Sequence, residues 1–334
     1  MSAPLRIAVD AMGGDRAPDE IVAGACQAVD ALGVEVLLFG TADAIAPLLP
    51  GGAAPAGVTV VPCSEVIEMH DDPARSVRTR KDASVVRAAE AVRDGAADAM
   101  VGAGNTGATM ASALLRYGRI RGTARPAIAV PIPVPFGRPH LLVDAGATVD
   151  ASPEWLVQFA RMGRAYARLR LGVEEPTVGL LSIGEEPGKG DDLRKQTFAM
   201  LEGEAWFTGN AEGRDFMTGR PDVIVTDGFT GNVALKSMES ALKAAAGLVF
   251  TVLGSTDETR AAAEVVTGPL LQAVSDYLDP DTIGGGALLG VDGVCIISHG
   301  SSSARAIVNA IGLAADCVRG GIVARLKEAV ADAG

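Results

Sequence analysis

The sequence is poor in cysteine, histidine and aromatic residues, and each scarcity excludes a class of protein. Its four cysteines (Cys26, Cys63, Cys295 and Cys317) lie far apart without a C-x-x-C pair, and there are only three histidines. This pattern lacks the ligand spacing of a zinc motif and offers no disulfide framework. We therefore expect no metal, no cofactor and a reducing compartment. Aromatic residues make up only 4% of the chain, too few for platforms that stack single-stranded nucleic acid.

Excess basic charge and long apolar runs are also lacking. The formal net charge is −12, whereas a nucleic-acid partner requires a broad basic surface. No run reaches about 18 uninterrupted apolar residues, so we expect no transmembrane helix. The most apolar run, Ala127–Phe136, is interrupted by prolines. The N-terminal segment reaches an acidic residue at Asp10, unlike a signal peptide. The expected protein is cytoplasmic and binds no nucleic acid.

What is abundant is a regular alternation of short β-branched runs with alanine-rich stretches, in a chain of 334 residues that is 48% apolar. The alternation predicts an α/β fold with three αβα layers around a mainly parallel sheet. We expect residues 1–334 to form one α/β domain with two lobes. The expected strands are Leu5–Val9, Val34–Phe39, Val58–Val61, Asp98–Val101, Leu141–Val143, Val178–Ile183, Val223–Val225 and Val294–Ile297. The expected helices lie near Pro18–Ala31, Ser84–Asp94, Gly107–Tyr117, Pro153–Leu169, Asp191–Glu202, Asn232–Val252 and Ser302–Cys317.

Residues 240–280 depart from this alternation, because Ser240–Tyr277 contains no clear strand and two helical runs separated by Gly254–Glu258. One interpretation is a helical pair packed on the main body or on a second subunit. The other is a helical protrusion that contacts lipid. The polar face of the second run has one basic residue, Arg260, which weakens any attraction to anionic membranes.

Glycine-rich polar motifs follow six of the expected strands. Because ligands of parallel sheets bind beyond the carboxyl ends of the strands, we expect these motifs to gather at one edge and bind an anion with backbone amides. The motifs are VDAMGGD (9–15), VGAGNTGA (101–108), VDAGAT (143–148), LSIGEEPGKG (181–190), VTDGFTGN (225–232) and ISHGSSS (297–303). The candidate phosphate- and substrate-binding residues are Gly13, Gly14, Asp15, Asn105, Thr106, Gly107, Asp144, Asp227, His299, Gly300 and Ser301.

Familiar nucleotide and hydrolase motifs fit these glycines poorly. Gly102–Gly107 matches G-x-G-x-x-G, but no acidic residue for a ribose occurs before Asp144, so only a cofactor with a 2′-phosphate stays open. Gly184–Gly190 is one residue short of a phosphate-binding P-loop. There is no G-x-S-x-G nucleophile motif. His299 is interpreted either as a hydrogen-bonding wall residue or as a direct participant.

Lys189 is the most informative single residue, since it lies between glycines at the end of an expected strand. It is either a solvated lysine paired with neighbouring acids or a cation that holds phosphate or stabilises an oxyanion.

With these motifs assembled, the chain resembles the PlsX-type acyl-ACP:phosphate acyltransferases from about Ile7 to the final helix. The resemblance is carried by VDAMGGDRAP, GAGNTGA, VDAGATVD, IGEEPGKG, FTGNAEGRD, DGFTGNVALK, GGGALLGVDG and SHGSS. It implies a fold similar to isocitrate and isopropylmalate dehydrogenases, a homodimer, and transfer of a fatty acyl group from acyl-ACP to inorganic phosphate for phospholipid synthesis. It also implies catalytic roles for Lys189 and Asn232. A peripheral contact with the inner face of the cell membrane and with a downstream glycerol-phosphate acyltransferase would follow.

The acidic acyl carrier protein requires a local basic patch, and the sequence offers two. The first patch is Arg75, Arg78, Arg80 and Lys81, and the second patch is Arg116, Arg119, Arg121 and Arg125. Three alternatives stay open: a phosphate acyltransferase that uses acetyl-CoA, an NADP-dependent decarboxylating dehydrogenase on the same fold, and a non-catalytic scaffold at the membrane.

Overall fold

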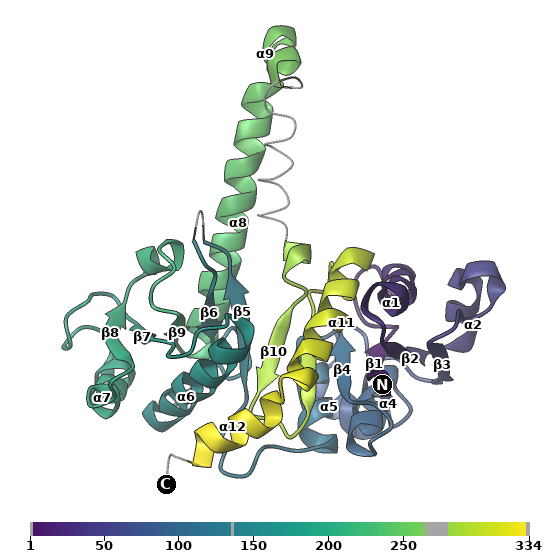
Figure 1. Ribbon diagram of the computed structural model, residues 1–334, viewed down its shortest axis with the longest axis horizontal. Helices are drawn as coiled ribbons and strands as arrows, with labels where there is room; N and C mark the ends of the chain where they lie inside the picture. The colour runs from purple at the N-terminus through teal and green to yellow at the C-terminus, as the bar shows by residue number, and fades with distance from the viewer. Residues whose placement is uncertain (1–2, 135–136, 264, 266–279, 332–334) are drawn as a thin grey trace.

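The computed structural model describes residues 3–134, 137–263, 265 and 280–331. It contains an 11-stranded sheet in the order β3-β2-β1-β4-β11-β10-β5-β6-β9-β7-β8 (Figure 1). The strands are β1 (Arg6–Asp10), β2 (Glu35–Gly40), β3 (Val58–Pro62), β4 (Ala99–Gly102), β5 (Ala127–Ile132), β6 (His140–Val143), β7 (Val178–Leu181), β8 (Phe207–Ala211), β9 (Val223–Val225), β10 (Gly286–Leu289) and β11 (Val294–Ile297). The helices are α1 (Asp19–Leu32), α2 (Ala42–Ile45), α3 (Pro73–Thr79), α4 (Ser84–Arg93), α5 (Thr106–Arg116), α6 (Pro153–Arg170), α7 (Asp192–Leu201), α8 (Gly228–Leu253), α9 (Asp257–Ala262), α11 (Ala304–Arg319) and α12 (Ile322–Ala331).

The α/β class and the mainly parallel sheet are confirmed. All eight expected strands are present, with ends that differ by at most two residues. Only the pairs β10–β11, β10–β5 and β5–β6 are antiparallel among the strand pairs described. The three strands that the sequence did not predict are β5, β8 and β10. Each antiparallel pair contains β5 or β10.

These three antiparallel pairs reverse the direction of the sheet. Strands β6, β9 and β7 are parallel to one another and run opposite to the parallel neighbours β1, β4 and β11. The expectation that all six motifs share one edge is therefore wrong as stated. Sheet twist reduces the difference, because six steps from β1 to β9 at about 20–25° each rotate the strand direction by about 120–150°. An antiparallel strand rotated that far points within about 60° of β1, so the two sets of carboxyl ends point in a similar direction.

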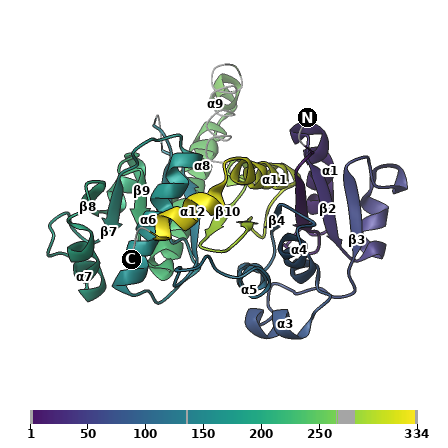
Figure 2. The same ribbon diagram turned by 60° about the horizontal axis from the view of Figure 1, so that its bottom comes forward.

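Helices cover both faces of the sheet and give three layers (Figure 2). Buried residues of α1, α6, α11 and α12 belong to the core on one face. Those of α4 and α5 belong to the core on the other face, where Leu235 and Met238 of α8 also pack. Each strand has alternate residues on the two faces, so the sheet is buried on both sides.

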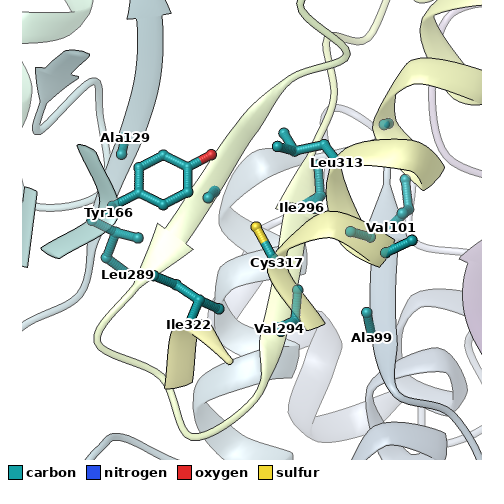
Figure 3. Close-up of a cluster of buried hydrophobic side chains, with 14 of the residues drawn as sticks. Ala99, Val101, Ala129, Tyr166, Leu289, Val294, Ile296, Leu313, Cys317 and Ile322 are labelled. Carbon is teal, nitrogen blue, oxygen red and sulfur yellow. The ribbon is translucent and has the colours of Figure 1, made fainter. Parts of the chain in front are cut away.

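The core on the first face joins the two parts of the sheet that run in opposite directions. Figure 3 shows the ring of Tyr166, from α6, beside Leu289 of β10, with its hydroxyl directed toward α11, where Leu313 and Cys317 lie. Tyr166 is fully buried, and burial raises its pKa. Helices α6 and α12 also pack on each other. The two halves of the sheet therefore share one continuous core.

Helix α8 rises from this body and carries α9 at its tip (Figure 1). Beyond the body it exposes Leu248, Val249, Phe250 and Val252. Of the predicted protrusion at 240–280, residues 264 and 266–279 lie outside the described residues. Among the described helices, none alone is long and apolar enough to cross a membrane; α11 and α12, bent by 59°, meet that test only as a pair and by length and composition.

Candidate active site

The first set of turns follows β1, β4 and β11, which are neighbours in the sheet. A Cβ atom on Gly13 would lie 2.8 Å from Cα of Gly104. Gly14 has φ of +120°, and a Cβ there would lie 3.0 Å from the carbonyl oxygen of Gly300 and 3.1 Å from that of Ala103. The amide of Asp15 donates to the same Gly300 oxygen at 2.7 Å. Only glycine allows these three turns to approach so closely.

This close approach leaves several backbone amides unpaired. Within the described residues, no hydrogen bond is made by the N–H groups of Gly13, Gly14, Thr106, Gly107 and Gly300. Thr106 and Gly107 form the first turn of α5, an 11-residue helix whose N-terminus adds partial positive charge. The first set thus presents several free backbone donors of the kind that bind anions at helix N-termini.

The side chain of Asn105 is occupied by the protein itself. Its Oδ1 accepts the amide of Ala108 at 3.0 Å and so caps α5. Its Nδ2 donates to the carbonyl oxygens of Met69 and Asp71, both at 3.1 Å. Asn105 therefore ties the loop before α3 to the first set of turns, and its side chain has a positioning role.

The second set of turns follows β6, β9 and β7, and the carboxylate of Asp144 organises it. Asp144 is fully buried, and its Oδ1 accepts the amides of Ile128, Gly146 and Ala147 at 2.8, 3.0 and 2.9 Å. Its Oδ2 accepts the amide of Thr148 at 2.6 Å. Burial raises the pKa of Asp144, and the four amide donors oppose that rise. The buried carboxylate shapes the loop that lies against the start of α8.

Two glycines of α8 allow that contact. A Cβ on Gly231 would lie 1.9 Å from the carbonyl oxygen of Asp144, and one on Gly228 would lie 2.6 Å from Oδ2 of the same residue. Opposite them, a Cβ on Gly146 would lie 2.8 Å from Nδ2 of Asn232. The amide side chain of Asn232 therefore lies close to Gly146 at the surface of the second set, where a side chain at position 146 would displace it.

A buried ion pair that the sequence did not reveal fixes the start of α8. Asp227 caps the helix by accepting the amide of Thr230 at 2.8 Å, and Arg194 of α7 forms an ion pair with Asp227. Arg194 also donates to the hydroxyls of Thr226 and Thr230 at 3.0 and 3.1 Å. Burial raises the pKa of Asp227, but the bonds from Thr230 and Arg194 outweigh it and leave this pKa lowered. The carboxylate of Asp227 is thus engaged in structure.

Lys189 lies in the loop after β7, where two of its four neighbouring acids pair with arginines. Glu185 pairs with Arg214 at 2.6 Å, and Asp191 pairs with Arg194 at 3.1 Å. Within the described part of the chain, the exposed ammonium of Lys189 has neither an ion pair nor a hydrogen bond. No ion pair within the described part of the loop occupies Lys189, and its role toward a ligand stays a prediction.

An apolar cavity of about 520 Å³, which the sequence did not predict, opens beside this loop. Its apolar lining comes from β7, the loops after β7 and β8, and α8, and comprises Leu181, Ile183, Phe216 and Ala234. Ile183 is 84% exposed at its rim. Such a cavity can bury a short aliphatic segment.

The two sets meet where α8 reaches the turn after β11. Nζ of Lys236 lies 2.6 Å from Nε2 of His299. Asn232 lies one helical turn before Lys236 on the same face of α8. The structure thus brings Gly13–Asp15, Asn105–Gly107 and His299–Ser301 together in the first set. Asp144, Asp227, Lys189 and Asn232 belong to the second set, and no hydrogen bond joins Lys189 to Asn232 among the described residues.

Each basic patch has one arginine in an ion pair, and the patches differ in the other contacts of their cations; Arg121 of the second patch is exposed and makes no ion pair or hydrogen bond within the described ranges. In the second patch, Arg116 pairs with Glu90 at 3.0 Å, Arg119 donates to a backbone carbonyl, and Arg125 lies 4.8 Å from the centre of the Trp155 ring. In the first patch, Arg80 pairs with Asp71. Three cations of the first patch are exposed and have no ion pair within the described ranges: Arg75, Arg78 and Lys81.

The structure is thus an α/β fold with unpaired backbone donors in the first set of turns and an apolar cavity beside the second set. Residues 5–325 match the family described as fatty acid synthesis protein. The chain is 45% identical over 326 residues to the phosphate acyltransferase of Desulfitobacterium hafniense (strain Y51), covering 97% of both chains. It is 47% identical over 335 residues to the phosphate acyltransferase of Synechococcus sp. (strain JA-3-3Ab), covering 98% of this chain and 90% of the relative.

Among solved structures, a phosphotransacetylase from Streptococcus pyogenes has a similar fold, with a TM-score of 0.62 and 17% identity over 95% of this chain and 94% of that one. The chain belongs to the fatty acid synthesis protein family, whose curated relatives are phosphate acyltransferases, and it is an acyltransferase. The family resemblance and the enzyme class predicted from the sequence motifs are thereby confirmed.

Proposed function

We propose that this enzyme transfers a fatty acyl group from acyl-ACP to inorganic phosphate and supplies acyl phosphate for phospholipid synthesis. The relatives named phosphate acyltransferases support phosphate as the acceptor. The observation that carries the proposal is the group of unpaired amides in the first set, joined to the Asn232 face of α8 by the contact between Lys236 and His299. An anion held there lies next to side chains that can polarise a carbonyl.

The chemistry needs little beyond positioning. An oxygen of hydrogen phosphate attacks the thioester carbonyl carbon, the carbonyl oxygen becomes an oxyanion, and collapse of the intermediate breaks the C–S bond. The products are acyl phosphate and a thiol, which takes up the proton of hydrogen phosphate. Holding both reactants in line contributes about 7–11 kcal/mol to lowering the barrier.

Asn232 and Lys189 would stabilise the oxyanion in this mechanism. The amide of Asn232 lies close to Gly146, and Lys189 has no ion pair within the described residues. A single well-placed donor to an oxyanion is worth about 2.7–4 kcal/mol. The apolar cavity beside β7 would hold the first part of the acyl chain.

The acyl carrier would dock on the first patch. The loop that leads into this patch contacts the first set of turns, because Asn105 binds the carbonyl groups of Met69 and Asp71. The exposed cations Arg75, Arg78 and Lys81 follow this loop in the chain and would attract an acidic partner to it. In the second patch, Arg116, Arg119 and Arg125 already have contacts within the chain.

We further propose a homodimer in the cytoplasm. The exposed apolar side chains of α8 (Leu248, Val249, Phe250 and Val252) support contact with a second copy or with the cell membrane, where a glycerol-phosphate acyltransferase would consume the product.

The direct test is trapping of acyl phosphate with hydroxylamine. Phosphate and either acyl-ACP or the acyl-CoA of the same chain length are incubated with and without purified enzyme, acyl hydroxamate and free thiol are measured, and the amounts formed without enzyme, by direct reaction of hydroxylamine with the thioester, are subtracted. We expect equal amounts of both products with acyl-ACP and a lower kcat/KM with acyl-CoA. A higher kcat/KM with acyl-CoA would favour the acyl-CoA alternative, and thiol release without hydroxamate would refute transfer to phosphate.

Docking is tested by charge reversal. Arg78→Glu should raise the KM for acyl-ACP without changing the KM for phosphate, and the effect should shrink as salt increases. Arg121→Glu in the second patch is the matched control. An equal rise in KM for both variants would count against the first patch as the docking surface.

A further inference from the structure

Lys236 occupies the point where the two sets of turns meet. Its Nζ lies 2.6 Å from Nε2 of His299 and 3.0 Å from Oε2 of Glu239. On the other side of the ring, Nδ1 of His299 lies 2.9 Å from Oγ of Ser301. These contacts form a hydrogen-bonded series from α8 to the turn after β11. The series ends at Ser301, next to Gly300, whose amide is unpaired within the described residues.

The contact with Lys236 determines which ring nitrogen of His299 carries the proton. A lysine ammonium has three donors and no acceptor, so Nε2 must accept. The proton of neutral His299 therefore resides on Nδ1, which donates to Ser301. The backbone N–H of Ser301 also points at Nδ1, at 3.4 Å. As a donor, it would favour an unprotonated Nδ1 and a proton on Nε2. That contact is at the limit of hydrogen bonding, whereas a proton on Nε2 would place two donors 2.6 Å apart.

The tautomer in turn sets what Ser301 offers to a ligand. When Nδ1–H donates to Oγ, the hydroxyl proton of Ser301 is left to donate to an anion. With the other tautomer, the hydroxyl would donate to Nδ1, and only its lone pairs would face the ligand. A phosphate oxygen is attracted by the first arrangement and repelled by the second.

Burial, and then the balance of neighbouring charges, favours the neutral form of the His299 ring. Facing it are Lys236, Glu239 and Lys243 of α8 and Asp15 of the turn after β1. Partial burial of the ring lowers the pKa of His299, the two lysines lower it further, and the two acids oppose them. A neutral ring has one donor and one acceptor. The residue at Nε2 therefore decides whether Nδ1 donates to Ser301 or accepts from it.

We propose that Lys236 is a positioning residue that fixes the Nδ1–H tautomer of His299 and thereby makes Ser301 a hydrogen-bond donor to phosphate. The kinetic part of this inference rests on the proposed transfer to phosphate, whereas the tautomer itself does not. The matched pair of variants is Lys236→Met and Lys243→Met, since both remove one lysine charge from the same face of α8 but only the first removes the contact. Lys236→Arg keeps a donor at Nε2.

The tautomer is measured by NMR of the ring nitrogens after histidine-selective ¹⁵N labelling. The chain has three histidines, and His299→Asn assigns the signal. We expect Nδ1–H in the wild type, Lys236→Arg and Lys243→Met, and a shift toward Nε2–H in Lys236→Met. Nε2–H in the wild type, or an unchanged tautomer in Lys236→Met, would overturn the proposal.

Kinetics then separate this role from a merely structural one. Losing one hydrogen bond to a charged ligand should raise the phosphate KM of Lys236→Met about 10–100-fold. The KM for the acyl donor should stay unchanged, and Lys236→Arg should recover most of the loss. Displacement of α8 would instead change kcat and both KM values together, which would contradict the assignment.

The pH dependence gives a second readout. Removing the Lys236 ammonium raises the pKa of His299, and a protonated ring has hydrogen on both nitrogens, so Nδ1 donates to Ser301 again. The ratio of phosphate KM between Lys236→Met and wild type should therefore fall toward one between about pH 8 and 6. A ratio that is flat or rises on acidification would overturn the proposal. If the wild type makes no acyl phosphate at all, the proposed function is wrong. The NMR measurement would still test the tautomer of His299 independently.

Discussion

The contact between Gly231 and Asp144 makes the sharpest prediction about geometry and turnover. In Gly231→Ala, the new Cβ would lie 1.9 Å from the carbonyl oxygen of Asp144 and 3.1 Å from Cγ2 of Thr226. The Asp144 loop cannot retreat easily, because the buried carboxylate holds it by four amide bonds. The start of α8 must therefore move away, and Asn232 moves with it.

The size of the effect follows from that distance. Carbon and oxygen need more than 3 Å of separation, so the displacement is on the order of 1 Å. A shift of about 1 Å in a positioning group costs about 10²-fold in rate. Overpacking costs about 1–3 kcal/mol, and alanine in a helix recovers about 0.5–1 kcal/mol relative to glycine. We expect kcat to fall about 100-fold with a net loss of at most about 2.5 kcal/mol in unfolding free energy.

The assay is acyl phosphate formation at saturating substrate, together with urea unfolding. Gly247→Ala is the control on the same helix, because no described atom lies within 4 Å of a Cβ there. It should gain about 0.5–1 kcal/mol in stability and keep wild-type kcat. A Gly231→Ala enzyme whose kcat is within twofold of wild type would refute the argument that this contact positions Asn232.

Three further predictions concern single side chains. Asn232→Ala should lower kcat about 10²–10³-fold with unchanged urea unfolding, and near-wild-type turnover would reject its role at the oxyanion. Arg194→Met should lower the unfolding free energy by about 3–5 kcal/mol, because it leaves Asp227 buried without its partner; a loss below about 1 kcal/mol would contradict this. Burial lowers the pKa of His140 below 6.5, so on acidification the unfolded state takes up the proton before the folded state does. The free energy of unfolding should therefore decline as pH falls from 6.5, by at most about 1.4 kcal/mol per pH unit. In His140→Gln this part of the decline should vanish, as unfolding at several pH values would show.

The strands that the sequence revealed and those that it hid differ in composition. Each of the eight predicted strands contains at least one β-branched residue, and all but the edge strand β3 are mostly buried. In contrast, β10 (Gly286–Leu289) has no β-branched residue, and β5 contains Pro131. This proline is tolerated because β10 pairs only with Ala127–Ala129, so Pro131 has a neighbouring strand only on its β6 side. Missing β5 and β10 concealed the reversal of the sheet, and with it the division of the site into two sets of turns.

The parts of the candidate site that depend on close contact between backbone segments were predictable from the sequence. Glycine motifs at strand ends indicated the turns, because close contacts such as Gly14 with Gly300 exclude other residues. The partners of polar side chains were not predictable from spacing. Arg194 and Asp227 are 33 residues apart, and Lys236 and His299 are 63 apart. Only the folded chain shows that Lys236 joins the two sets.

The most direct test of the central claim uses phosphate labelled with ¹⁸O on all four oxygens. If an oxygen of phosphate held by the first set attacks the thioester carbonyl, the acyl phosphate must retain all four labels while one thiol is released per product. Mass spectrometry of the acyl phosphate measures this retention. Full retention is the predicted result. Release of thiol with unlabelled fatty acid as the product, or acyl phosphate lacking one label, would contradict the account.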